Sequence, residues 1–125
     1  MIVLDSSAIL TFLYAEPGHE SVKDALESGL VCAANWSETL QKITFHGGDA
    51  TRQGDLLRLL GLEIEPLTRD DAATAARLFP QTRHAGLSLG DRCCLALAAR
   101  MGVQALTADR AWADLDIDVQ VRLVR

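Results

Sequence analysis

The segment IVLDSSAILTFL, residues 2–13, joins a short apolar run to an apolar stripe of helical spacing. Its first part, Ile2–Leu4, has the length and composition of a buried strand. Asp5 then stands where a helix N-cap is expected, and the apolar residues after it recur every three or four positions. The segment therefore predicts a buried strand that leads directly into an amphipathic helix, the repeating unit of parallel α/β sheets.

The remainder of the chain repeats this alternation of strand and helix. Further strands are expected at 30–34, 62–65, 103–106 and 117–124. Helices are expected around Val22–Leu26, from Asn35 to the glycines at 47–48, around Leu56–Leu60, over 68–79 and after Ser88, with a loop over 81–87. Asn35, Thr68 and Ser88 are the expected caps of three of these helices, and Pro80 is expected to end the helix that starts at Thr68. The strands at 62–65 and 117–124 alternate in polarity, as edge strands do. The absence of hairpin dipeptides between strands predicts a parallel sheet with helices on both faces.

Length and composition restrict the class of protein. The chain has 125 residues and 13.5 kDa, with 49% hydrophobic and 23% charged residues, which predicts one globular domain over residues 1–125. There is no apolar run long enough for a membrane span and no signal-peptide pattern at the start, so we expect a cytoplasmic protein without a membrane partner. The three cysteines are an odd number and are expected to be buried thiols.

The net charge of −5 argues against a simple basic nucleic-acid binder. However, if a cation neutralised four acids in one site, 13 acidic residues would face 12 basic ones, and the remaining surface would not strongly repel phosphate. Ten of the basic residues are arginines, which suit bidentate contacts with phosphate.

Four acidic residues lie where an α/β sheet binds its ligands. Asp5 and Asp109 each follow an expected strand, Glu38 lies one helical turn after another, and Asp91 lies in the first turn of a helix. Carboxylates brought close together repel one another unless a proton or cation offsets the charge. Oxygen ligands without imidazole or thiol partners favour Mg²⁺ over zinc.

A purely structural role explains the same acids. Three segments have capping-box spacing, in which the acid only accepts a backbone N–H: Asn35–Glu38, Thr68–Asp71 and Ser88–Asp91. Asp5 is also an ordinary N-cap. The spacing of these residues leaves both interpretations open.

Four segments together resemble a known family. They are VLDSSA at 3–8, NWSE at 35–38, GLSLGDRCCLALA at 86–98 and LTADRAW at 106–112. In order and spacing the chain is similar to the PIN-domain ribonucleases, and among them to the VapC toxins of bacterial toxin-antitoxin pairs. Arg92 and Trp36 depart from residues common in that family, but neither departure removes an acid.

The resemblance implies an α/β/α sandwich with a five-stranded parallel sheet in the order 3-2-1-4-5. It implies an endoribonuclease that uses Mg²⁺ or Mn²⁺ to hydrolyse RNA phosphodiester bonds, is inhibited by an antitoxin protein, and forms a homodimer. The catalytic and metal-binding quartet falls on Asp5, Glu38, Asp91 and Asp109. Ser6, Thr107 and Asp114 are candidates for positions beside the metal. The candidate RNA-binding residues are Arg83, Arg92 and Arg110, with Arg52 and Arg69 as further arginines of the same kind.

Three alternative functions require residues that can be checked in the sequence. A receiver domain with a Mg²⁺-binding phosphoacceptor site would need two adjacent acids after the first strand, but Leu4 precedes Asp5. It would also need a late lysine, and the only lysines are Lys23 and Lys42. A two-aspartate phosphatase would need an acid where Ser7 stands. A PIN-like domain that binds RNA or a protein without cutting remains open.

Overall fold

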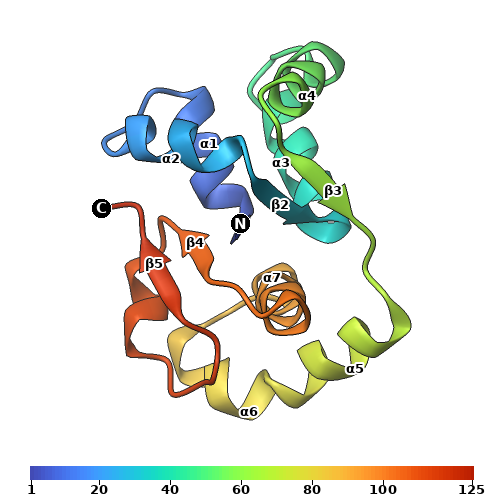
Figure 1. Ribbon diagram of the computed structural model, residues 1–125, viewed down its shortest axis with the longest axis vertical. Helices are drawn as coiled ribbons and strands as arrows, with labels where there is room; N and C mark the ends of the chain where they lie inside the picture. The colour runs from blue at the N-terminus through green and yellow to red at the C-terminus, as the bar shows by residue number, and fades with distance from the viewer.

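The computed structural model describes residues 1–125 and has a five-stranded sheet between helices (Figure 1). The strands are β1 (Ile2–Leu4), β2 (Gly29–Cys32), β3 (Glu63–Glu65), β4 (Ala105–Thr107) and β5 (Val121–Leu123). The α-helices are α1 (Ser6–Leu13), α2 (His19–Leu26), α3 (Ala33–Phe45), α4 (Ala50–Leu59), α5 (Arg69–Arg77), α6 (Phe79–Thr82) and α7 (Leu89–Met101). Two 3₁₀-helices complete the chain, η1 (Arg83–Ala85) and η2 (Arg110–Asp114).

All strand pairs are parallel, and the strand order is β3-β2-β1-β4-β5, which confirms the expected topology. β1 is central because Val3 pairs with Leu30 of β2 on one side and with Ala105 of β4 on the other. The chain order reverses at β1, so the carboxyl ends of β1 and β4 form a topological switch point. The two alternating strands, β3 and β5, lie at the edges as predicted.

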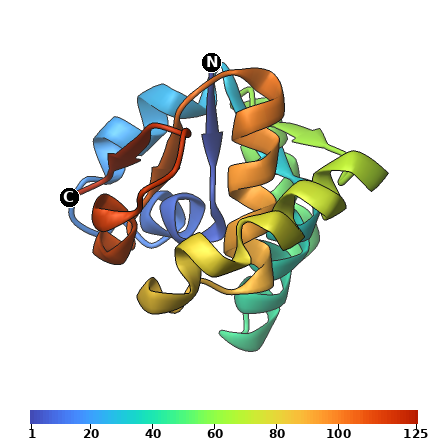
Figure 2. The same ribbon diagram turned by 90° about the horizontal axis from the view of Figure 1, so that it is seen from below.

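Two apolar clusters cover the two faces of the sheet. One packs α5 and α7 against Val3, Leu30 and Ala105, while the other packs α1, α2 and α4 against Leu4 and Val31. Figure 1 shows α5 and α7 on one side of the sheet and α1 and α2 on the other. Figure 2 shows α7 alongside β1. This arrangement confirms an α/β fold with helices on both faces.

Helix α3 packs against α1, α4 and α7. It thereby links helices that belong to the two opposite faces of the sheet. A side chain on its first turns can consequently reach the start of α7, and Glu38 does so.

Several expected boundaries are wrong, each because a tertiary contact decided it. β2 ends at Cys32, and α3 begins at Ala33 with Cys32 as its N-cap, so Asn35 is not a cap but the third residue of the helix. The final strand is only Val121–Leu123, because pairing with β4 extends no further. Strand β4 is shifted to Ala105–Thr107, in register with β1.

The segment after α5 also differs from the prediction. Helix α5 ends at Arg77, and Pro80 stands in the first turn of α6, where its missing N–H costs no hydrogen bond. The expected loop at 81–87 contains the end of α6 and the 3₁₀-helix η1.

The two remaining capping boxes are confirmed. Thr68 and Asp71 exchange side-chain and backbone hydrogen bonds at the start of α5, and Ser88 and Asp91 do the same at the start of α7. All three cysteines are buried free thiols. No helix is both long enough and apolar enough to cross a lipid bilayer.

Candidate active site

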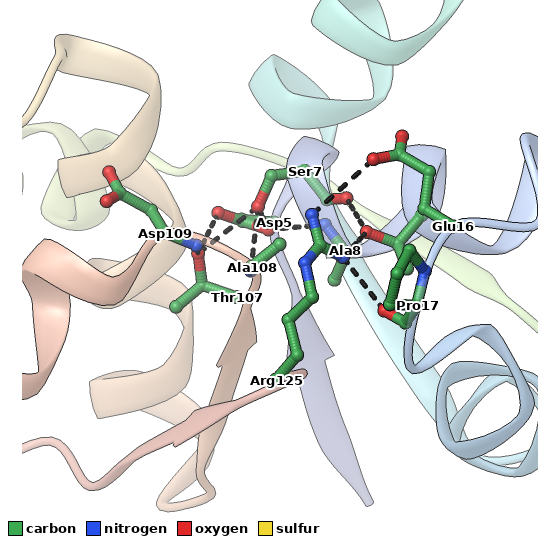
Figure 3. Close-up of polar contacts among 10 residues, drawn as sticks. Asp5, Ser7, Ala8, Glu16, Pro17, Thr107, Ala108, Asp109 and Arg125 are labelled. Carbon is green, nitrogen blue, oxygen red and sulfur yellow. Dashed lines mark hydrogen bonds and ion pairs between the residues drawn. The ribbon is translucent and has the colours of Figure 1, made fainter.

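The carboxylate of Asp5 lies at the carboxyl end of β1, where it is almost fully buried. Its Oδ1 accepts hydrogen bonds from the Ala8 backbone N–H at 2.8 Å and from the Ser7 hydroxyl at 2.7 Å. Its Oδ2 accepts a 2.6 Å hydrogen bond from the hydroxyl of Thr107 (Figure 3). Asp5 is therefore both the N-cap of α1, as predicted, and the centre of a polar network between β1 and β4.

The pKa of Asp5 is raised to about 6, mainly by burial and to a smaller extent by the nearby charge of Asp91, against the opposing hydrogen bonds from Thr107, Ala8 and Ser7. A buried carboxylate with a raised pKa is stabilised in its charged form by any cation that binds beside it. The electrostatics of Asp5 thus favour a cation site.

Thr107 connects Asp5 to Asp109. Its hydroxyl accepts the backbone N–H of Asp109 at 3.0 Å while it donates to Asp5. Ser7 lies 3.2 Å from the same hydroxyl and accepts the Ala108 N–H at 2.9 Å. These contacts tie the ends of β1 and β4 together. They support a role for Thr107 beside the site.

Ser7, and not Ser6, supplies the hydroxyl next to Asp5. Ser6 is half-buried and its side chain makes no hydrogen bond in the chain. One step along a helix rotates a side chain by about 100° around the axis, so neighbouring serines point to different sides. A small hydroxyl two residues after a capping Asp is a local signal that could have identified Ser7.

Glu38 approaches the start of α7 from α3. Its Oε1 accepts a 2.9 Å hydrogen bond from the Asn35 amide, which also donates to the Gly90 carbonyl at 3.0 Å. Gly90 immediately precedes Asp91. In the sequence, Asn35 has the pattern of a helix cap, and its contact with Gly90, 55 residues away, leaves no local signal.

Asp91 and Asp109 are each held by one carboxylate oxygen. Asp91 Oδ2 accepts the Ser88 N–H at 2.8 Å, and Asp109 Oδ1 accepts the Ala111 N–H at 3.0 Å. The other oxygens, Asp91 Oδ1 and Asp109 Oδ2, have no hydrogen bond from the protein, and neither has Glu38 Oε2. Each acid thus combines a structural contact with an oxygen available to a ligand.

The four acids lie at one edge of the molecule. Asp5, Glu38 and Asp109 follow the carboxyl ends of β1, β2 and β4, and Asp91 is at the start of α7, which runs back from that edge to β4. No three acidic, histidine or cysteine side chains are close enough to hold one metal ion together. The donor chemistry, oxygen atoms around a raised-pKa carboxylate, fits a hard divalent cation.

The other candidate residues make different contacts. Asp114 is exposed at the end of η2. Arg92 donates to the Ala75 carbonyl at 2.9 Å and stacks over the ring of Phe79, so its side chain is directed at α5 and α6.

Two further arginines were candidates for contacts with RNA. Arg110 donates to the Arg125 carbonyl, and Arg83 is exposed. Arg125 itself donates to the Thr11 hydroxyl of α1 at 3.2 Å. It also donates to the carbonyl of Pro17, in the segment between α1 and α2, at 2.9 Å (Figure 3).

Comparisons with solved structures reveal the same fold in toxin-antitoxin systems. A chain in a toxin-antitoxin complex from Klebsiella pneumoniae aligns with a TM-score of 0.79 at 15% identity, covering 100% of this chain and 98% of the other. Mycobacterium tuberculosis VapC20, a Sarcin-Ricin loop cleaving toxin, aligns with a TM-score of 0.71 at 16% identity, covering 96% and 99%. A chain of the DNA-bound VapBC complex from Salmonella typhimurium aligns with a TM-score of 0.72 at 13% identity, covering 99% and 98%.

Sequence comparison with curated proteins finds no significant match. The family model of the PIN domain matches residues 2–118. Four of the five strands and all four acids lie within that match. The chain therefore belongs to the PIN domain family.

Proposed function

We propose that this chain is a metal-dependent endoribonuclease that acts as the toxin of a toxin-antitoxin pair. The observation that carries the proposal is the placement of Asp5, Glu38, Asp91 and Asp109, from four distant segments, at the carboxyl edge of the sheet in a PIN domain. The domain is proposed to span residues 1–125 and to act in the cytoplasm. Full-length similarity to toxins in antitoxin complexes supports the biological role.

One or two Mg²⁺ or Mn²⁺ ions would be held here, with Asp5 and Asp91 as the central ligands and Glu38 and Asp109 as direct or water-mediated ligands. When bound, such an ion activates water and neutralises charge on the phosphoryl oxygens. The protein itself supplies carboxylate oxygens that are held in a fixed arrangement. Ser7 and Thr107 orient the carboxylate of Asp5, and the capping contact of Ser88 orients Asp91.

RNA would be held through its backbone by arginines around this edge. Arg83 is exposed and free to bind phosphate, whereas Arg92 and Arg110 already contact carbonyl oxygens and would have to exchange or share those contacts. A cognate antitoxin would inhibit the enzyme by placing a guanidinium among the acids. We also propose a homodimer, which light scattering on the purified chain would detect.

Cleavage of defined RNAs tests the proposal. Purified protein is incubated with a single-stranded RNA and a hairpin RNA in Mg²⁺, Mn²⁺ or EDTA, beside Asp5→Asn and Asp91→Asn. The control is Asp24→Asn, an exposed acid on α2 near Met1, at the opposite end of the sheet. We expect cleavage by the unchanged protein and the control only with metal, and a loss of at least 100-fold in both site variants.

Two results would contradict the proposal. Cleavage that survives EDTA and both substitutions would show that the activity does not come from this site. Metal binding without cleavage of either RNA would instead favour a non-catalytic PIN domain that binds RNA or a protein.

A further inference from the structure

Asn35 is a fully buried amide that joins α3 to α7. Its nitrogen donates one hydrogen bond to Glu38 Oε1 at 2.9 Å and another to the Gly90 carbonyl at 3.0 Å. Both partners are acceptors, so only the NH₂ side of the amide can make these contacts. The two donors of Asn35 therefore hold the Glu38 carboxylate beside the start of α7.

This arrangement has a cost in stability. The Oδ1 atom of Asn35 is buried and has no hydrogen-bond partner. A buried acceptor left unpaired is unfavourable, and Asn is a poor residue for a helix interior. These two costs offset part of the stabilisation that the two donated hydrogen bonds supply, so stability alone does not explain an amide at this position.

Gly90, on α7, is likewise a residue type that a helix does not favour. A Cβ atom at this position would collide with the carboxylate of Glu38. Its φ angle does not lie in the left-handed region, so the backbone does not require glycine. Alanine has the higher helix propensity, so the absence of a side chain at Gly90 is explained by the space that Glu38 occupies.

We propose that Asn35 and Gly90 are positioning residues that fix the Glu38 carboxylate next to Asp91 for cation binding. The inference rests on the proposed metal-dependent function. Asn35 occupies one oxygen of Glu38, and Gly90 leaves the space in which the carboxylate sits. The second oxygen, Oε2, has no hydrogen bond from the protein and remains available to the ion. Two locally unfavourable residues on different helices thus converge on one acid, as is common at functional sites.

Binding of Mn²⁺ to the purified chain, measured by titration calorimetry without RNA, tests this inference. The variants are Asn35→Leu, which removes both donors at similar size, and Gly90→Ala, which places a methyl group against Glu38. Thr39→Val is the matched control, because Thr39 is equally buried on α3 and bonds only the Asn35 backbone carbonyl. We expect both variants to weaken Mn²⁺ binding by ten- to a hundredfold and the control to bind like the unchanged protein.

A second background separates positioning from general structure. In Glu38→Ala, no carboxylate remains to be positioned, so adding Asn35→Leu or Gly90→Ala should cause no further loss of Mn²⁺ affinity. Gly90→Ala should also raise the metal-free melting temperature more in the Glu38→Ala background than in the unchanged protein, because the collision is gone while the helix preference for alanine remains.

The outcomes distinguish a failure of the positioning role from a failure of the proposed function. Mn²⁺ affinity unchanged in both variants, while Asp5→Asn loses it, would overturn the positioning role and leave the proposed function standing. Failure of the unchanged protein to bind Mn²⁺ would overturn the metal-dependent function itself. Should Asn35→Leu not fold, as judged by circular dichroism, Gly90→Ala and its Glu38→Ala double variant decide the question.

Discussion

The hydroxyl of Thr107 donates a 2.6 Å hydrogen bond to Asp5 Oδ2, and this contact joins residues 102 positions apart at the carboxyl ends of β4 and β1. The same hydroxyl accepts the backbone N–H of Asp109. One threonine thus connects a buried carboxylate to a second acid of the site. The contact exists because the parallel sheet places β1 and β4 side by side.

Replacing Thr107 with valine should lower the free energy of unfolding by about 1–3 kcal/mol, because Asp5 and the Asp109 N–H each lose a partner in a buried environment. Urea unfolding of metal-free protein measures the change. Thr44→Val is the control, since its exposed hydroxyl bonds only a carbonyl of its own helix. Equal effects of the two substitutions would mean that the Thr107 network contributes nothing specific.

Asp5→Asn should stabilise the metal-free protein at pH 8 by about 1–3 kcal/mol. Burial raises the folded-state pKa of Asp5 from 3.8 to about 6, so between these values the folded state holds a proton that the unfolded state has lost. Stability therefore falls as pH rises through this window, and the penalty is complete above it. Unfolding curves at pH 4 and pH 8 check the sign. A variant less stable than the parent at pH 8 would contradict the prediction.

Asp71→Asn should have the opposite pH dependence. Burial would raise the pKa of Asp71, but hydrogen bonds from Arg100 and Thr68 outweigh it and hold the pKa below its ordinary value. Its contribution is present above pH 3.8 and is lost as pH falls through the folded-state pKa. We expect a loss of about 1–3 kcal/mol at pH 7 that shrinks in acid, measured by urea unfolding. Asp70, the exposed neighbour of Asp71, provides the control: Asp70→Asn should change the free energy of unfolding little at either pH.

Ser88→Ala should separate capping from catalysis at the start of α7. Loss of the cap should cost about 1 kcal/mol of stability, while Asp91 keeps its carboxylate. Under the proposed function, RNA cleavage should fall less than tenfold in Ser88→Ala and at least 100-fold in Asp91→Asn. Cleavage assays and thermal unfolding of both variants provide the comparison. Similar losses of activity in the two would indicate that Asp91 acts only through the cap.

Leu57→Ala should cost about 2–5 kcal/mol, because Leu57 is fully buried against the sheet. Leu59→Ala should change stability by less than about 0.5 kcal/mol, since Leu59 is 86% exposed on the same helix. Denaturant unfolding of the pair measures the contrast. Comparable losses would show that Leu59 is covered in solution.

Local sequence was sufficient for features formed within one helical turn. The N-cap at Asp5 and the capping boxes at Thr68 and Ser88 were predicted correctly because their partners lie three residues away. The spacing of apolar residues likewise predicted the five strands and the longer helices, but not α6 and η1, and the similarity to the PIN family supplied the strand order, which the structure confirms.

Tertiary packing decided the rest, since contacts between distant segments leave no mark in local spacing. Pairing with β3 extends β2 to Cys32, where α3 begins, and this places Asn35 inside α3 with its amide toward Gly90. Leu56 and Leu57 are adjacent and look alike in the sequence, yet Leu57 packs in the core against the sheet and is fully buried, whereas Leu56 is exposed. Glu38 reaches the start of α7 because α3 packs against helices on both faces of the sheet. No spacing along the chain encodes that packing.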